Sequence, residues 1–243
     1  MKKDIKKALG CIRKADQDFG LIAEGDAIAV GVSGGKDSLL LLYCLSLYRN
    51  FCKNRFTLEA ITVFLGLEPF DVSAVKALCD QMSIPYHVIE TDIGRVVFDV
   101  RQEKNPCSLC ANMRRGALNN AAKALGCNKI ALGHHSDDVI ETFLMSLFYE
   151  GRINTFSPKT YLSRTDLTVI RPFVYLPEKD IISAAKDLVL PIITSPCPAC
   201  GKTNRQKTKE LITALSKDIP DIKEKLLGAL ANTEQYHLWE KEK

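Results

Sequence analysis

The chain has 243 residues, of which 46% are hydrophobic and 26% charged, as expected of a soluble globular protein that folds as one large domain or a domain with an appendage. Its net charge of +4 excludes a strong cationic field over the whole surface, so a nucleic-acid partner would need local basic patches. No segment approaches the length of a membrane span, and the lysine-rich N-terminus lacks the apolar core of a secretory signal. We therefore expect a cytoplasmic protein without a membrane partner, whose nine cysteines stay reduced.

The first segment, residues 1–24, is predicted to hold an amphipathic basic helix ahead of the first strand. Its apolar residues recur at helical spacing: Ile5, Ala8, Leu9 and Ile12. The basic residues around them are Lys2, Lys3, Lys6, Lys7, Arg13 and Lys14. This basic face fits a solvated surface and an RNA contact equally well.

A glycine-rich turn follows the first predicted strand. Residues 27–32 form the continuous apolar run of a central parallel strand, and residues 39–43 continue as a buried helix. Between them, Gly34 and Gly35 allow positive φ and let a ligand approach the backbone closely. The N–H groups at the start of the helix, the helix dipole and Lys36 all favour an anion at this turn.

Asp37 sharpens this interpretation, because a carboxylate beside a polyphosphate is repulsive unless a divalent cation bridges them. The turn therefore predicts Mg²⁺ and a phosphate chain, with Ser33 and Ser38 as additional hydroxyl donors. The structural alternative is a tight strand-to-helix turn capped by Ser33 and Asp37. The run Ser33–Ser38 resembles the S-G-G-x-D-S signature of the PP-loop ATP pyrophosphatase superfamily. The resemblance implies cleavage of ATP between the α and β phosphates, with transfer of AMP to a substrate oxygen.

Strands and helices alternate along the middle of the chain. Further strands are predicted at 57–65, 86–90, 129–133 and 168–171, and helices at 72–82, 138–149 and 177–190, with an alanine-rich helix that follows the first cysteine pair and ends at Leu125. Residues 91–106 give no clear signal, and 151–164 are predicted to be a loop. This alternation predicts an α/β fold with a doubly wound, mostly parallel five-stranded sheet. We assign residues 25–194 to an ATP-binding catalytic domain and 195–243 to a helical, RNA-binding appendage that begins with a cysteine turn.

Two C-x-x-C pairs, Cys107/Cys110 and Cys197/Cys200, each follow a proline. Two such pairs in one chain with reduced cysteines predict thiolates that converge on a metal centre. Zinc would hold the appendage to the core, whereas an iron–sulfur cluster uses the same thiolate chemistry, and the spacing does not decide between them. The remaining cysteines are predicted to be buried small residues: Cys11, Cys44, Cys52, Cys79 and Cys127.

The segment Gly133–Asp138 follows a predicted parallel strand, at the sheet edge where open α/β proteins bind ligands. We therefore nominate Gly133, His134 and Asp137 as nucleotide-binding residues. Adjacent histidines on an extended segment point to opposite sides, so His134 and His135 are poor candidates to bind one metal together. Capping of the following helix by Asp137 or Asp138 is the simpler alternative.

Two basic groups lie close to the cysteines in sequence. Arg114 and Arg115 follow the first pair, and a run consisting of Lys202, Arg205, Lys207 and Lys209 follows the second. Arg114 and Arg115 suit RNA phosphates or a leaving pyrophosphate, with a solvated face as the alternative. The run after the second pair favours RNA binding, because it would place the RNA beside the cysteines.

The order of these motifs over residues 26–215 resembles the tRNA 2-thiocytidine synthase family, TtcA. The motifs are Ser33–Ser38, Pro106–Cys110, Arg114–Gly116, Gly133–Asp138, Ile170–Pro172, Glu178–Ile181 and Pro196–Gly201. The resemblance implies a [4Fe–4S] cluster held by Cys107, Cys110 and Cys197, with one iron open and Cys200 spare or a persulfide carrier. It also implies catalytic roles for Lys36, Asp37 and Cys200.

The implied reaction is tRNA thiolation. ATP with Mg²⁺ adenylates the C2 oxygen of a cytidine in the anticodon loop, and sulfur replaces that oxygen to give 2-thiocytidine. The implied partners are tRNA, ATP, a cysteine desulfurase or another sulfide donor, and a second copy of the chain in a homodimer. Two alternatives stay open: a zinc-stapled PP-loop enzyme that adenylates another tRNA base or a small molecule, and a nucleotide-binding regulatory protein.

Overall fold

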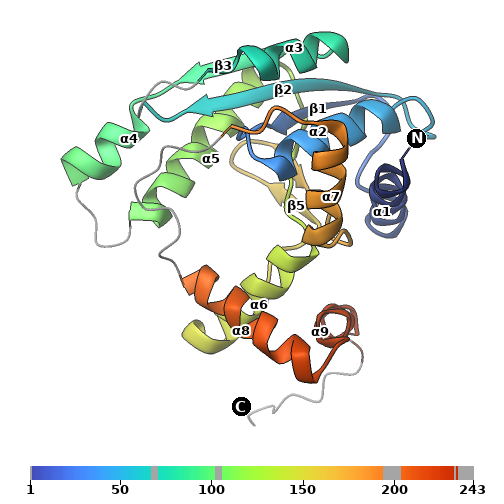
Figure 1. Ribbon diagram of the computed structural model, residues 1–243. Coiled ribbons are helices and arrows are strands. Elements are labelled where there is room, and N and C mark those ends of the chain that lie inside the picture. The colour runs from blue at the N-terminus through green and yellow to red at the C-terminus, as the bar shows by residue number, and fades with distance from the viewer. Residues whose placement is uncertain (1, 67–70, 102–105, 194–203, 233, 235–243) are drawn as a thin grey trace. The chain divides into compact units, whose positions relative to one another are not determined.

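A computed structural model describes residues 2–66, 71–101, 106–193, 204–232 and 234. The first part of the chain is built on a six-stranded sheet with the order β3-β2-β1-β4-β6-β5, of which Figure 1 labels β1, β2, β3 and β5. The strands are β1 Asp26–Gly31, β2 Phe56–Phe64, β3 Tyr86–Glu90, β4 Lys129–Ala131, β5 Lys159–Leu162 and β6 Leu167–Ile170. All neighbouring strands pair in parallel except β5 and β6, which are antiparallel.

Helices connect the strands and form the C-terminal region. They are α1 Lys3–Phe19, α2 Lys36–Tyr48, α3 Ser73–Gln81, α4 Ile93–Arg95, α5 Pro106–Ala124, α6 Ser136–Glu150, α7 Glu178–Leu188, α8 Asn204–Asp218 and α9 Ile222–Ala231. A π-helical segment, Val96–Arg101, continues α4. The predicted doubly wound, mostly parallel sheet is thereby confirmed. None of the described helices is both long and apolar enough to cross a membrane.

The predicted number of strands is wrong, because β5 lies in the segment that we expected to be a loop. This short strand pairs antiparallel with β6, from Lys159 opposite Ile170 to Leu162 opposite Leu167. Its side chains alternate between exposed and half-buried, so no residue in it is fully buried. An edge strand of this kind is held by the ladder with its neighbour and leaves little hydrophobic signal in the sequence.

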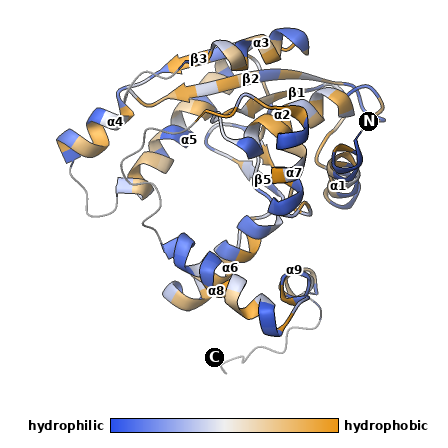
Figure 2. Ribbon diagram, in the orientation of Figure 1, coloured by the Kyte–Doolittle hydropathy of each residue, from blue (hydrophilic) through white to orange (hydrophobic). Residues whose placement is uncertain are grey.

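The two faces of the sheet carry different helices because the chain reverses direction across the sheet after β3. With right-handed crossovers, α2 and α3 lie on one face and α5 on the other. On the α5 face, Leu118 and Ala122 pack in one cluster with Ala29, Ile61 and Val169. On the other face, α1, α2 and α7 contact one another. β2, which lies between these layers, is largely orange in Figure 2.

The described residues separate into two compact units. The first holds the sheet and comprises residues 1–135 and 157–200, and the second comprises residues 136–156 and 201–243. In the second unit, Ile140 and Leu144 of α6 pack against Ile212 of α8. The sequence-based segments 1–24, 25–194 and 195–243 remain a prediction about functional organisation.

Candidate active site at the carboxyl edge of the sheet

The turn after β1 is held by its own hydroxyl groups. Ser38 Oγ accepts from the Ser33 N–H at 3.1 Å, lies 3.2 Å from Ser33 Oγ and donates to the Gly35 carbonyl at 3.0 Å. Gly34 has φ of 81°, a left-handed conformation that favours glycine. The two serines thus shape the turn from within, and the first turn of α2 begins at Lys36 with its backbone N–H groups facing the turn.

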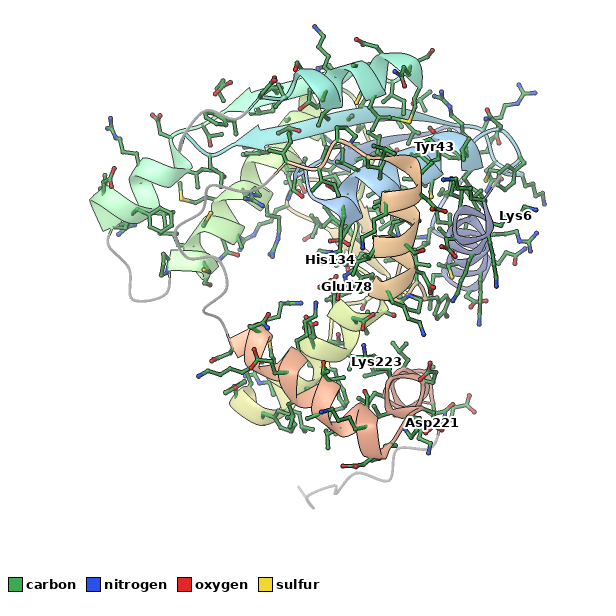
Figure 3. All side chains as sticks on the ribbon, in the orientation of Figure 1. Lys6, Tyr43, His134, Glu178, Asp221 and Lys223 are labelled. Carbon is green, nitrogen blue, oxygen red and sulfur yellow. The ribbon has the colours of Figure 1, made fainter. Side chains whose placement is uncertain are left out.

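The ammonium group of Lys36 forms ion pairs with two carboxylates. Its Nζ lies 3.1 Å from Asp37 Oδ1 and 3.1 Å from Glu178 Oε1, which is contributed by the first turn of α7. Burial alone would lower the pKa of Lys36, but the charges and hydrogen bonds of Asp37 and Glu178 outweigh it and raise that pKa. The ammonium group is therefore fixed in its charged form at the mouth of the turn. Figure 3 labels Glu178 at the start of α7.

The segment after β4 closes against this turn. A Cβ at Gly133 would lie 2.9 Å from the Asp37 carbonyl carbon and 3.1 Å from the Ser38 nitrogen, so only glycine allows the two backbones to approach this closely. The buried His135 follows, with its Nε2 3.8 Å from Asp37 Oδ1. His134, labelled in Figure 3, lies half-buried between these two residues. Gly133 therefore lies against the turn, and His135 approaches Asp37.

The chain segment that leads to the second cysteine pair also contacts the turn. The Ile193 N–H donates to the Gly34 carbonyl at 2.9 Å, and a Cβ added at Gly34 would lie 3.0 Å from Ile193 Cβ. Cys197 and Cys200, which follow a few residues later, lie outside the described residues. The segment that precedes this pair therefore packs against the predicted phosphate turn through Ile193.

The first cysteine pair lies in the first turn of α5, which starts at Pro106. Cys107 is exposed and Cys110 is half-buried against the cluster formed by Leu65, Ile93 and Val97. Side chains three residues apart on a helix are neighbours, about 5–6 Å apart at Cβ, so both thiolates can reach one metal or cluster. The donor set therefore suits a thiolate-bound centre. Within the described ranges, no three His, Cys, Asp or Glu side chains are grouped closely enough to hold a metal.

The direction of α5 places this pair toward the carboxyl edge of the sheet, the edge at which the turn also lies. A Cβ at Gly31, the last residue of β1, would lie 3.0 Å from Leu118 of α5. Because α5 joins two parallel strands, its earlier turns extend past the carboxyl edge. Cys110 precedes Leu118 by two turns, about 12 Å along the helix axis.

Several basic residues nominated from the sequence serve as internal contacts. Within the first unit, Lys7 Nζ pairs with Asp180 of α7 at 2.7 Å, and Lys14 Nζ lies 4.8 Å from the centre of the Tyr175 ring. The exposed Lys6 (Figure 3) makes no ion pair among the described residues. Part of the basic face of α1 therefore holds this helix in place.

In the second unit, acidic residues at the start of α6 form ion pairs with Arg205 and Lys223. Arg205 Nη1 lies 3.1 Å from Asp138 Oδ1 and 3.2 Å from Glu141 Oε2. Lys223 of α9 (Figure 3) pairs with Asp137 at 2.5 Å. Burial raises the pKa of Glu141 more than Arg205 lowers it. Asp137, nominated as a nucleotide ligand, is thus held by Lys223 in this structure.

Sequence reasoning missed Glu178 and His135 as site residues. The local signals for Glu178 are its place in the Glu178–Ile181 motif and in the first turn of a helix that follows the carboxyl end of β6. The approach of both side chains to Lys36 and Asp37 depends on tertiary packing. The predicted burial of the other cysteines is confirmed for Cys44, Cys79 and Cys127, whereas Cys11 and Cys52 are only half-buried.

A known protein family and several known proteins resemble this chain over most of its length. A family model described as a PP-loop domain matches residues 4–212, so the fold and the turn define a PP-loop protein. The tRNA-cytidine(32) 2-sulfurtransferase of Geobacter sulfurreducens is 38% identical over 97% of this chain and 92% of its own length. The one of Syntrophotalea carbinolica is 40% identical over 97% of this chain and 91% of its own length. The chain belongs to the tRNA-cytidine(32) 2-sulfurtransferase family, within the PP-loop proteins.

A solved structure extends the comparison to three dimensions. The U34-tRNA thiolase NcsA from Methanococcus maripaludis, solved with its [4Fe-4S] cluster, matches with a TM-score of 0.79 and 28% identity. The match covers 97% of this chain and 81% of that one. An NH3-dependent NAD synthetase from Campylobacter jejuni, 18% identical with a TM-score of 0.50, shares only the fold.

Proposed function

We propose that this protein is an ATP-dependent tRNA sulfurtransferase that converts a cytidine, expected to be nucleotide 32 of the anticodon loop, to 2-thiocytidine. The observation that carries this proposal is that the glycine-rich turn with Lys36 and Asp37 lies at the carboxyl edge of the sheet, toward which the first turn of α5 with Cys107 and Cys110 also extends. The names of the relatives at 38–40% identity support the choice of cytidine.

ATP is the first substrate. The backbone N–H groups at the start of α2 and the ammonium of Lys36 would receive its phosphates, and Asp37 would hold the Mg²⁺ that bridges them. Lys36 then exchanges one or both of its carboxylate partners for phosphate oxygens. The C2 oxygen of cytidine attacks the α-phosphorus, pyrophosphate leaves, and the turn stabilises the charge that develops on it.

Adenylation makes the C2 oxygen a good leaving group, and sulfur must then arrive at C2. Cys107, Cys110 and Cys197 would hold a [4Fe–4S] cluster, and Cys200 would be spare or carry a persulfide. Such a cluster, when bound with an iron open, supplies a site for sulfide. The thiolates of Cys107 and Cys110, at the start of α5, would anchor the cluster beside the phosphate turn. When sulfur replaces the C2 oxygen, AMP leaves with that oxygen.

The proposal also includes the sulfur donor, the oligomeric state and the location in the cell. A cysteine desulfurase or another sulfide donor supplies the sulfur, the protein acts as a homodimer, and it works in the cytoplasm, where its tRNA substrate is found. Each of these points is inferred from the family.

The test is thiolation of unmodified tRNA by anaerobically purified protein with ATP, Mg²⁺ and sulfide, followed by mass spectrometry of the nucleosides. We expect 2-thiocytidine that depends on ATP, with iron and sulfide in the protein. The variant Cys107→Ser should lose both the iron and the product, whereas the matched control Cys11→Ser should keep both. Formation of 2-thiouridine would contradict the choice of base. Zinc without iron would contradict the cluster and leave the zinc-stapled PP-loop enzyme as the better account.

A further inference from the structure

The outer side of α1 carries a row of basic residues, Lys3, Lys6 and Arg13, which we call the basic stripe. All three are exposed, and none of them forms an ion pair or a side-chain hydrogen bond with another described residue. Their basic neighbours Lys7 and Lys14, by contrast, are both held by contacts within the first unit. Figure 3 shows Lys6 on the side of α1 that points away from the sheet.

The stripe follows one face of the helix. Each residue of an α-helix turns by about 100° and rises about 1.5 Å, so Lys3, Lys6 and Arg13 fall within an arc of about 80° and span about 15 Å along the axis. Ile5 and Ile12, on the opposite side of α1, are buried in the core. The three positive charges are therefore presented in one line to the surroundings of the protein.

The acidic residues of α1 are bound to other parts of the first unit. Asp16 accepts a hydrogen bond from the Tyr48 hydroxyl at 2.9 Å. Asp18 accepts one from the hydroxyl of another tyrosine, and Asp4 accepts one from a serine of α7. The carboxylates of α1 thus bind the protein itself, and the stripe on the outer side consists of positive charges.

The electrostatics of the helix do not favour this arrangement. Like charges three or four residues apart on a helix repel each other, and cations in the first turn are opposed by the helix dipole. Both effects act on Lys3 and Lys6, which lie three residues apart in the first turn of α1. A helix face that serves only solubility usually mixes both signs of charge, so a stripe of one sign favours an anionic polymer as its ligand.

We propose that the basic stripe binds the phosphate backbone of tRNA outside the target nucleotide. This inference deepens the proposed function and rests on it, because that reaction requires a tRNA. The stripe and the phosphate turn belong to the same unit, and α1 packs against α7, whose Glu178 contacts Lys36. An RNA strand carries a phosphate at every nucleotide, so a row of cations can follow it without reading its bases. The stripe should therefore contribute to the affinity for tRNA and leave the binding of ATP unchanged.

The test is binding of tRNA without turnover, measured over a series of salt concentrations. The triple variant Lys3→Gln/Lys6→Gln/Arg13→Gln changes only exposed side chains and should fold normally. We expect its Kd for unmodified tRNA to rise at least about tenfold and its salt slope to fall by about two to three, with an unchanged Kd for ATP. A tRNA without cytidine at the target position should show the same loss. Lys3→Arg/Lys6→Arg keeps the charges and should keep the affinity.

The matched control is the triple variant Lys53→Gln/Lys76→Gln/Arg164→Gln. These three residues are exposed and belong to the same unit, but they lie in the loop after α2, in α3 and in the turn between β5 and β6. If the stripe variant binds tRNA as the control does, the inference is wrong. It is also wrong if the stripe variant keeps its affinity for tRNA but loses binding to vesicles of anionic lipid.

The inference and the proposed function can fail separately. If the wild-type protein forms 2-thiocytidine but the stripe variant binds tRNA normally, only the inference is refuted. If the stripe variant loses affinity for tRNA but the wild-type protein forms no 2-thiocytidine, only the proposed function is refuted.

Discussion

The two ends of the sheet each hold a lysine paired with an aspartate, and the surroundings of the two pairs differ. At the amino edge, Lys129 Nζ lies 2.6 Å from Asp26 Oδ2, and both side chains are less than 10% exposed. Lys129 also donates to the Leu21 carbonyl, and Asp26 accepts from the Ala23 N–H and the Asn128 side chain. At the carboxyl edge, Lys36 and Asp37 are 27% and 33% exposed and meet beside a glycine turn.

This difference distinguishes a structural pair from a reactive one. The pair at the amino edge is buried, and both of its side chains have further hydrogen-bond partners within the protein. A ligand that bound there would have to break these hydrogen bonds. The pair at the carboxyl edge is partly open to solvent, and Glu178 competes with Asp37 for the same ammonium. Lys36 can therefore exchange partners when an anion arrives, which is what binding of a polyphosphate requires.

The largest effect is expected at Asp37. The variant Asp37→Asn keeps the shape of the side chain but removes the charge that would hold Mg²⁺, so ATP-dependent thiolation should fall by about three orders of magnitude. Removal of divalent cations with a chelator should have a similar effect on the wild-type protein. The exposed Asp80 of α3 provides the control, since Asp80→Asn should leave the rate unchanged. Substantial thiolation by Asp37→Asn would refute the metal role.

The pair at the amino edge should show the opposite behaviour. Lys129→Met leaves Asp26 buried without its charged partner, which should reduce the free energy of unfolding by about 3–5 kcal/mol. Urea denaturation measures this change, and the rate per folded molecule should stay the same. Adding Asp26→Asn should recover part of the loss because the buried charge is removed. Lys36→Met should do the reverse, with little change in stability and weak ATP binding; equal behaviour of the two lysine variants would abolish the distinction.

A smaller effect is expected where the backbone at Gly133 contacts the backbone of Asp37 and Ser38. Gly133→Ala places a methyl group against the backbone of Asp37 and Ser38, so the turn must shift by a few tenths of an ångström. We expect the KM for ATP to rise about tenfold, or about 1.4 kcal/mol, with a modest loss of stability. The control is Gly10→Ala in α1, where no atom lies within 4 Å of the added Cβ and the helix should be slightly stabilised. An unchanged KM in Gly133→Ala would show that this contact does not shape the site.

The smallest effect is expected for a third lysine–aspartate pair, Lys7 with Asp180. Although the two groups lie 2.7 Å apart, the Lys7 side chain is 49% exposed. Lys7→Met should therefore change the free energy of unfolding by at most about 1 kcal/mol, and less in high salt. Thermal unfolding at low and high ionic strength measures this. A loss as large as that of Lys129→Met would mean that distance, rather than enclosure, determines the strength of these pairs.

The sequence predicted what local pattern determines. The turn at Ser33–Ser38 was predictable because an apolar strand, two glycines and an apolar helix follow one another directly. The alternating elements were predictable for the same reason, and β3 is found at the expected residues, Tyr86–Glu90. The amphipathic helix at the N-terminus is also confirmed, with Ile5, Leu9 and Ile12 buried.

What depends on distant residues was not predictable. β5 exists only because β6 pairs with it, and the contact of Glu178 with Lys36 requires α7 to pack against α2. The predicted alanine-rich helix was placed after the first cysteine pair, whereas α5 already begins at Pro106 and includes the pair. Proline is common at the first helical position because its missing N–H has no partner to lose there.

The fate of one oxygen atom tests the central claim most directly. Unmodified tRNA that carries ¹⁸O at C2 of its cytidines should be incubated with the protein, ATP, Mg²⁺ and sulfide, and the AMP and pyrophosphate examined by mass spectrometry. If the turn activates the C2 oxygen by adenylation, one ¹⁸O appears in AMP for each 2-thiocytidine formed, and none appears in pyrophosphate. Formation of 2-thiocytidine with unlabelled AMP would contradict the account.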